Sequence, residues 1–362
     1  AGRVDVVATN KADDAHVVRR ADGVTEVTLS HKGNQYFRRE FRGDETSEIR
    51  LYLQGGGDKL SVEGNGGGPT LRVIGGGGDD QFVTGGVGGV HLYDDEGTNR
   101  ATGAGINRRP WWWQPDSTDP TVLPPRDWGR KTVLQVTGGY GHDIQAVLGY
   151  QGHTDWFAFR RFPYATRVDY GIEVATGKRS GRASFGITRQ FENSNGFLEL
   201  KSMASGIEKV RWYGFGNESA PLTTRKDANF YRAGQTELSA TLRLGSRLGA
   251  RSRFAIGPTV RWSETNLSDQ ENAKRFIGSD RPLGSGSFGL VGLAGELLVE
   301  GRDQPKFATR GAALRVEATG YPGLWDAVKP LGRVDVEGSF TLAPRGSWRP
   351  SINVMAGGSK TW

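Results

Sequence analysis

"VDYGIEV", residues 168–174, alternates apolar side chains with charged or small ones without a break. The four apolar letters fall on one side of an extended chain, and Asp169, Gly171 and Glu173 fall on the other. Because successive side chains of a β-strand point to opposite faces, this stretch predicts a strand with one apolar and one charged face.

The same alternation recurs along the chain from residue 131 onward. It is clearest in "ELSATLRL" (237–244), "AALRVEAT" (312–319) and "RVDVEGSFTL" (333–342). About eleven segments have this character. Many run to about twelve residues, longer than ordinary globular strands and long enough for tilted strands that cross a bilayer. The predicted segments are 131–141, 144–158, 164–176, 181–192, 196–206, 228–245, 250–264, 286–300, 307–319, 331–343 and 349–362.

The connections between these segments differ in length. Residues 207–227 and 265–285 form long links, whereas "NSNG" (193–196) and "GSRLGA" (245–250) are short. Outer-membrane barrels have long outer loops and short periplasmic turns. We therefore predict an all-β fold in which residues 131–362 form an antiparallel transmembrane β-barrel, with both long loops outside and 300–306 on the periplasmic side. A soluble β-sandwich would explain the alternation but not the strand lengths.

The first hundred residues have a different pattern. Short strand-like runs such as "VTEVTLSH" (24–31) and "EIRLYLQ" (48–54) are separated by Gly, Asp and Asn, which predicts a small glycine-rich all-β domain over 1–100. Residues 101–130 are rich in Pro, Gly and Trp and have no period, so we expect a linker there. Its Trp111–Trp113 run fits either a packing cluster between domains or a belt at a membrane interface.

One stretch of the first domain, "GGGGDDQFV" (75–83), fits the calcium-binding nonapeptide G-G-x-G-x-D-x-U-x. Calcium takes six or more oxygen ligands, so one nonapeptide supplies only part of a site. The nearest partner is "LQGGGDKLS" (53–61), which makes Asp58 and Asp80 the candidate calcium ligands. They are 22 residues apart, whereas tandem coils would place them nine apart. A plain turn between stacked strands of an exported domain is the alternative.

Composition excludes several classes of function. The chain of 362 residues has no Cys and no long apolar run, so a transmembrane helix is not expected. The formal charge of +7 is dispersed among acidic residues, which argues against a nucleic-acid surface. The five His lack metal-ligand spacing and no G-x-S-x-G motif occurs, so we do not expect an enzyme.

Two stretches carry a family resemblance. "VEGRDQPKFATRGAALRVEATGYP" (299–322) contains Arg302, Asp303, Pro305 and Gly311 in order before a long strand. It resembles a signature of the BamA/TamA-type outer-membrane barrel superfamily, also called the bacterial surface antigen family. Arg302 and Asp303 fit either a charge pair that ties a turn to a strand base or a plain polar turn.

The second stretch, "VRWYGFGNES" (210–219), resembles another segment of the same superfamily through Gly214, Gly216 and Asn217. Residues 36–100 also look like the small β domain that precedes the barrel in some large members. The resemblance implies an outer-membrane protein that inserts or translocates proteins or lipids. Residues 1–130 would lie in the periplasm, and the partners would be outer-membrane lipid and client outer-membrane or periplasmic proteins.

The resemblance also implies a barrel of about sixteen strands, an even number as in other bacterial barrels. We therefore expect the chain to be an internal fragment, followed by about five more strands after Trp362, because unpaired strand edges are costly in lipid. Two further functions remain open. The barrel would anchor a larger surface or periplasmic hydrolase, or the chain would be a soluble calcium-binding adhesin.

Overall fold

The computed structural model describes most of the chain and shows an all-β protein, 69% strand and 2% helix, as predicted. It divides into two compact units, Ala1–Trp113 and Gln114–Trp362. The described residues are 2–64, 67–86, 89–94, 96–109, 126–141, 144–177, 180–214, 228–249, 251–265, 267, 276–282, 284–303, 308–343 and 352–361.

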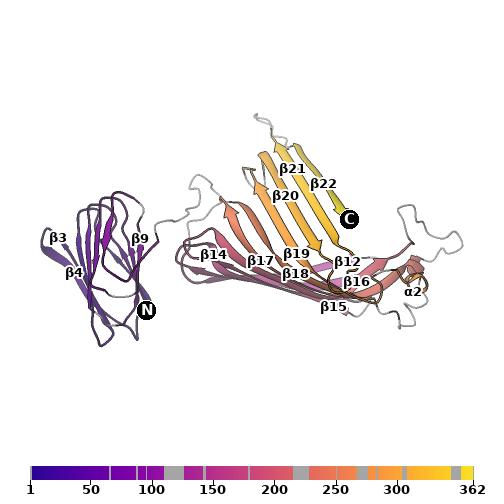
Figure 1. Ribbon diagram of the computed structural model, residues 1–362, viewed down its shortest axis with the longest axis horizontal. Coiled ribbons are helices and arrows are strands. Elements are labelled where there is room, and N and C mark those ends of the chain that lie inside the picture. The colour runs from indigo at the N-terminus through magenta and orange to yellow at the C-terminus, as the bar shows by residue number, and fades with distance from the viewer. Residues whose placement is uncertain are drawn as a thin grey trace. The chain divides into compact units, whose positions relative to one another are not determined.

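The first unit is a two-sheet solenoid (Figure 1, indigo to magenta). One sheet is parallel throughout and has the order β1 (Arg3–Val7), β5 (Glu48–Tyr52), β7 (Thr70–Ile74), β9 (Val90–Tyr93) and β11 (Ile106–Arg108). The other has the order β10 (Arg100–Thr102), β8 (Gln81–Thr84), β6 (Lys59–Gly64), β2 (Asp14–Arg19), β3 (Val24–His31) and β4 (Asn34–Arg42). From β5 onward the chain alternates between the sheets, so each coil adds one strand to each.

The core of the solenoid lies between its two sheets. Ile49, Leu51, Leu71 and Val73 of the parallel sheet are fully buried, and so is Val62 of the other sheet. Val62, Leu71 and Val73 alternate with exposed or half-buried neighbours, the period-two pattern of a strand with one buried face, whereas Arg50 between Ile49 and Leu51 is buried as well. Apolar burial between the sheets is therefore what holds the coils together.

The solenoid extends past the predicted domain boundary at residue 100. Strand β10 (Arg100–Thr102) crosses the boundary and β11 (Ile106–Arg108) lies within the segment 101–130 that was expected to be a linker. They pair with β8 and β9. Three residues are too few for an alternation to show in the sequence. Trp111–Trp113 and the rest of 110–125 lie outside the described residues.

The second unit is a single antiparallel sheet of eleven strands in chain order. The strands are β12 (Arg130–Gly141), β13 (Gln145–Ala158), β14 (Arg161–Ala175), β15 (Ser180–Gln190), β16 (Gly196–Arg211), β17 (Arg232–Leu248), β18 (Ser252–Glu264), β19 (Ser287–Glu300), β20 (Arg310–Tyr321), β21 (Leu331–Leu342) and β22 (Ile352–Thr361). Among the described residues of the connections, η1 (Ala228–Tyr231) and α2 (Phe276–Asp280) are short helical segments. All eleven predicted segments are strands. The main difference is β16, which continues to Arg211 and shortens the loop predicted from 207.

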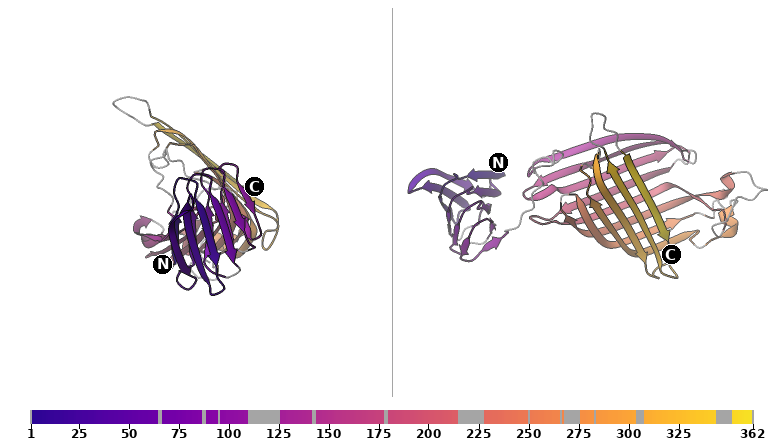
Figure 2. Two further views of the ribbon diagram at one scale, coloured as in Figure 1. Left: turned by 90° about the vertical axis from the view of Figure 1, so that its left-hand side faces the viewer. Right: turned by 90° about the horizontal axis from the view of Figure 1, so that it is seen from above.

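The sheet curves strongly, as Figure 2 shows, and β12 and β22 are its edge strands. Because each strand reverses direction, the β16–β17 and β18–β19 connections lie at one end of the sheet. The β19–β20 turn and the start of β12 lie at the other end. Within the described part of the chain, no helix has the length and apolar character needed to cross a membrane.

Candidate functional site

The candidate calcium ligands Asp58 and Asp80 lie one coil apart in the solenoid. Strands β6 and β8 pair in parallel with Lys59 opposite Gln81, so the residues just before them are stacked. The spacing of 22 residues is therefore the length of one coil. The nine-residue repeat of the nonapeptide does not describe this unit, because each coil here contributes two strands.

These aspartates belong to a ladder of four residues, in which three side chains accept backbone amides. The amide of Asp13 donates to Oδ1 of Asp58, the amide of Asp58 donates to Oδ1 of Asp80, and the amide of Asp80 donates to Oδ1 of Asn99, each at 2.8 Å. Each of the four residues directly precedes a strand of the second sheet. Asp13 and Asn99 were not predicted. An Asp or Asn before successive strands was the signal that would have found them.

The glycines of the corner allow the coils to stack closely. Gly56 and Gly78 have φ of +135° and +130°, and a Cβ on Gly78 would lie 1.6 Å from the carbonyl oxygen of Gly56. Gly97 repeats the arrangement one coil later, where a Cβ would lie 1.8 Å from the carbonyl oxygen of Gly78. The stretch 75–83 therefore forms a corner of the solenoid, and Gly78 lies there at a position that only glycine fits.

The carboxylates of Asp58 and Asp80 are buried in a way that favours the protonated form. Burial, together with the charges of Asp80 and Asp13, raises the pKa of Asp58 to about 6, and burial also raises the pKa of Asp80. Their Oδ2 atoms are buried without a hydrogen-bond partner among the described residues. Within the same residues, no group of three or more His, Asp or Glu side chains is arranged to hold a metal ion. Calcium at Asp58 and Asp80 stays a prediction.

The predicted motif residues Arg302 and Asp303 both make contacts within the β19–β20 turn, and each does so through other partners. Arg302 forms an ion pair with Glu300 at 2.5 Å. The carboxylate of Asp303 accepts hydrogen bonds from Thr309 and from the amide of Arg310. Arg251, from the β17–β18 turn, donates to the carbonyl oxygens of both motif residues at 2.7 and 2.8 Å.

The glycines of the two motifs have separate positions. Gly311 opens β20 with φ of +111°, and a Cβ there would lie 2.4 Å from the carbonyl oxygen of Gly301. Gly214 follows the end of β16 with φ of +115°. The remaining motif residues, Pro305, Gly216 and Asn217, lie outside the described residues. The two motifs are at opposite ends of the sheet and do not form one site.

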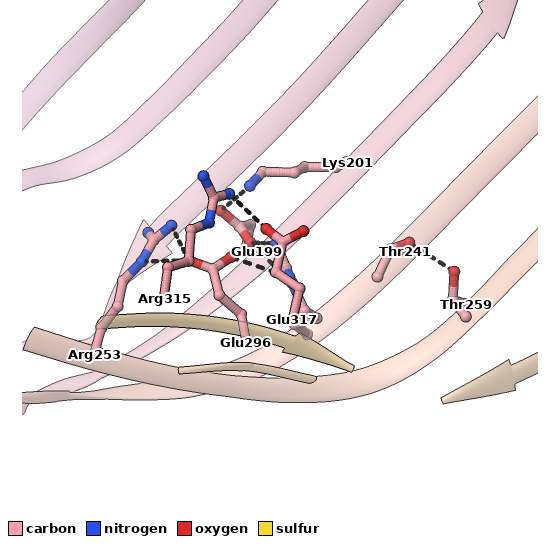
Figure 3. Close-up of polar contacts among 9 residues, drawn as sticks. Glu199, Lys201, Thr241, Arg253, Thr259, Glu296, Arg315 and Glu317 are labelled. Carbon is pink, nitrogen blue, oxygen red and sulfur yellow. Dashed lines mark hydrogen bonds and ion pairs between the residues drawn. The ribbon is translucent and has the colours of Figure 1, made fainter. Parts of the chain in front are cut away.

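One face of the eleven-stranded sheet carries a chain of ion pairs, and we call it the charged face (Figure 3). Lys201 lies 3.1 Å from Glu199, and Arg243 lies 2.5 Å from the same carboxylate. Arg243 also reaches Glu296 at 3.2 Å, and Arg253 lies 2.7 Å from Glu296. Glu199, Arg243 and Glu296 are buried, so each charge is compensated where it is shielded from water.

The contact between Arg243 and Glu296 passes over a whole strand. Arg243 is on β17 and Glu296 is on β19, with β18 between them. A Cβ on Gly257 of β18 would lie 2.9 Å from Cα of Arg243. Ala255, the next residue of β18 on this face, is opposite Glu296 in the register. The absence of large side chains at these two positions lets the guanidinium cross β18.

Further pairs extend the charged face. Arg167 binds Asp155 through two hydrogen bonds of 2.6 and 2.8 Å between β14 and β13. Arg182 bridges Glu173 at 2.9 Å and Glu208 at 2.6 Å. These further pairs join opposite charges on neighbouring strands, a favourable cross-strand arrangement.

The other face of the same sheet, the apolar face, is exposed. Its side chains include Val136 (77% exposed), Leu148 (66%), Ile172 (61%), Leu244 (57%) and Leu293 (57%), from five different strands. Soluble proteins rarely expose contiguous apolar surface on this scale. The polarity of the sheet is inverted relative to a soluble sandwich, since the charged face is the more buried one.

The two long connections contact each other at one end of the sheet. The indole nitrogen Nε1 of Trp212 donates to Asp280 of α2 at 2.7 Å. Phe230 stacks on Phe276 with ring centroids 5.7 Å apart, and Tyr231 packs edge-on against Phe276 at 5.8 Å. The described parts of these connections therefore form one aromatic cluster.

No family model matches the chain. No curated protein matches it either.

Proposed function

We propose that residues 130–361 belong to a transmembrane antiparallel β-barrel of a bacterial outer membrane, in a protein of the BamA/TamA-like group that inserts or translocates proteins or lipids. The observation that carries the barrel is the exposed apolar face, opposite a face of paired charges, on one long-stranded sheet. Lipid is the solvent in which an exposed Leu, Val and Ile surface is stable and in which polar side chains face inward.

Strand length supports the same proposal. The strands of the sheet run from 10 residues in β22 to 17 in β17. A tilted transmembrane strand needs about 9–11 residues. The eleven strands would form part of a barrel of about sixteen, whose other strands pair with the edges of β12 and β22.

The group and the activity rest on the motif residues and not on the sheet alone. Arg302 and Asp303 organise the turn before β20, and Gly311 occupies a backbone position that strongly favours glycine. The solenoid would lie on the periplasmic side, because β12 begins at the end of the sheet opposite the long connections.

The membrane proposal is tested by fractionation and gel migration of the full chain. We expect the protein to sediment with outer membranes, to require detergent for extraction and to migrate faster on gels when it is not boiled. Release into the soluble fraction without detergent, with identical migration before and after boiling, would instead support the calcium-binding adhesin.

The insertion activity is tested separately, once the chain is in vesicles. We expect vesicles that contain the protein to accelerate the folding of a small outer-membrane client barrel over protein-free vesicles. A chain that inserts correctly but gives no acceleration would leave only the role of a membrane anchor for a larger protein.

A further inference from the structure

A groove of about 550 Å³ crosses the apolar face close to the end with the long connections. Its floor consists of small residues on β15, β16 and β17, namely Ala183, Ala204, Ser202 and Ala240. The hydroxyl of Ser202 donates to the carbonyl oxygen of Phe185 at 3.2 Å, so the sheet itself satisfies this polar group. The floor therefore presents an apolar surface.

Large apolar side chains stand around this floor. Phe185, Leu238 and Val260 line the groove and are 46%, 46% and 37% exposed. Trp262 and Trp325 also line the groove. The difference in size between floor and walls gives the groove its depth on an otherwise exposed face.

Trp325 is held on the apolar face by its neighbours in the β20–β21 connection. Its ring occupies the space above Gly289 of β19, where a Cβ would lie 2.2 Å from Cε2. The carboxylate of Asp326 accepts a hydrogen bond from the amide of Gly289 at 2.7 Å, and the backbone amide of Asp326 donates to the carbonyl oxygen of Gly289 at 3.2 Å. The connection is thus fastened to the sheet beside the groove.

The second indole belongs to the sheet itself. Trp262 is opposite Gly289 in the register of β18 and β19, and its Nε1 donates to Oγ of Ser287 at 2.8 Å. Both tryptophans therefore flank Gly289, one from β18 and one from the folded-back connection.

The indoles lie at the polar edge of the apolar face. Two residues along each strand toward the long connections, the residues on this face are Thr236, Glu264 and Ser287, which are opposite one another in the register. Two residues the other way they are Ala240, Val260 and Val291. Tryptophan gathers at this kind of boundary in membrane proteins, at the level of the lipid head groups.

We propose that the groove binds an acyl chain of a membrane lipid whose head group lies level with Glu264 and Ser287. The occupant follows from position, because the groove is continuous with the exposed apolar face and begins two residues from its polar edge. The inference rests on the proposed transmembrane barrel and adds a defined lipid site to it.

The test uses the full chain in phosphatidylcholine vesicles that contain increasing fractions of a chain-brominated phosphatidylcholine, which quenches nearby tryptophan. The fluorescence of the two indoles is obtained as the difference between the emission of the wild type and that of a double variant, Trp262→Phe with Trp325→Phe. We expect their quenching to saturate at a low fraction of brominated lipid. Ala204→Leu with Ala240→Leu fills the floor and should abolish saturation, whereas Ala312→Leu, on β20 of the same face, should leave it unchanged.

Quenching that rises in proportion to the brominated fraction, and that is the same in the filled variant, would overturn the groove and leave ordinary boundary lipid. That outcome would not affect the proposed barrel. A chain that does not enter the vesicles at all would overturn the proposed barrel, and the groove with it.

Discussion

Asp58 is fully buried, and its Oδ1 accepts the amide of Asp13 while Oδ2 has no hydrogen-bond partner among the described residues. Its pKa of about 6 exceeds the value of about 4 for an unfolded chain. An acid whose pKa rises on folding stabilises the fold below the unfolded pKa, and this contribution is lost as the pH rises through the folded pKa. The loss is on the order of 2–3 kcal/mol above about pH 6.

We therefore expect Asp58→Asn to stabilise the solenoid at about pH 8 and to give no such gain at about pH 4. The amide oxygen keeps the acceptor for the Asp13 amide, as Asn99 does for the amide of Asp80. Hydrogen exchange of peptides from β5 to β8 measures the effect in the full chain. Asp14→Asn, at an exposed neighbour, is the control and should change little. Weaker protection of Asp58→Asn at about pH 8, with calcium protecting only the wild type, would favour a bound cation.

The sequence singled out two residues of the ladder, Asp58 and Asp80, and their role as calcium ligands stays a prediction. The nonapeptide pointed to Asp58 and Asp80 because it marks a glycine corner followed by an acid. It could not show that one coil takes 22 residues, since coil length depends on which strands pair. Asp13 was missed because the β3–β4 hairpin separates it from Asp58 by 45 residues.

Among the elements, β16 to β19 are joined on the charged face by Arg243, which contacts Glu199 and Glu296. Removing Arg243 leaves each of these buried carboxylates with one cation, Lys201 or Arg253, so we expect the lower end of the cost of a broken buried pair, about 3 kcal/mol. We expect Arg243→Met to lower the stability of the sheet by about this amount, measured by urea unfolding of the full chain in detergent. Adding Glu199→Gln and Glu296→Gln should recover most of the loss, because the two cations that then lose a partner, Lys201 and Arg253, are exposed or half-buried.

The matched control is Arg315→Met on β20. Arg315 pairs with Glu317 on the same face, but the two side chains are 52% and 44% exposed. An exposed pair contributes no more than about 1 kcal/mol. Equal losses of stability for Arg243→Met and Arg315→Met would show that the buried ion pairs of Arg243 contribute no more than an exposed pair.

Alternation in the sequence predicted the strands of the sheet and the side of each on which charges lie. It did so because a sheet with one apolar face repeats every second residue over many residues. The contact of Arg243 with Glu296 could not be predicted this way, because it passes over β18 and depends on Gly257 and Ala255. The groove beside Trp325 could not be predicted from the sequence either, since the β20–β21 connection has no periodic pattern of apolar residues.

At the scale of the whole molecule, the parity of the strands determines which connections share an end. The β16–β17 and β18–β19 connections are together, and the aromatic cluster around Phe276 joins them. The β15–β16 turn lies at the opposite end with the β19–β20 turn and the start of β12. The proposed outer-membrane barrel would have the end with the long connections outside, so we expect the β15–β16 and β19–β20 turns to face the periplasm.

Single cysteines test this orientation without background, because the chain has no Cys. Ser279 of α2 is exposed at the end with the long connections, and Ser194 is exposed in the β15–β16 turn at the other end. On intact cells we expect a membrane-impermeant maleimide to label Ser279→Cys and not Ser194→Cys, and to label both after the outer membrane is permeabilised. Labelling of Ser194→Cys alone on intact cells would invert the topology and place the solenoid outside. Labelling of both on intact cells would mean that the sheet does not separate two compartments, and the transmembrane proposal would fail.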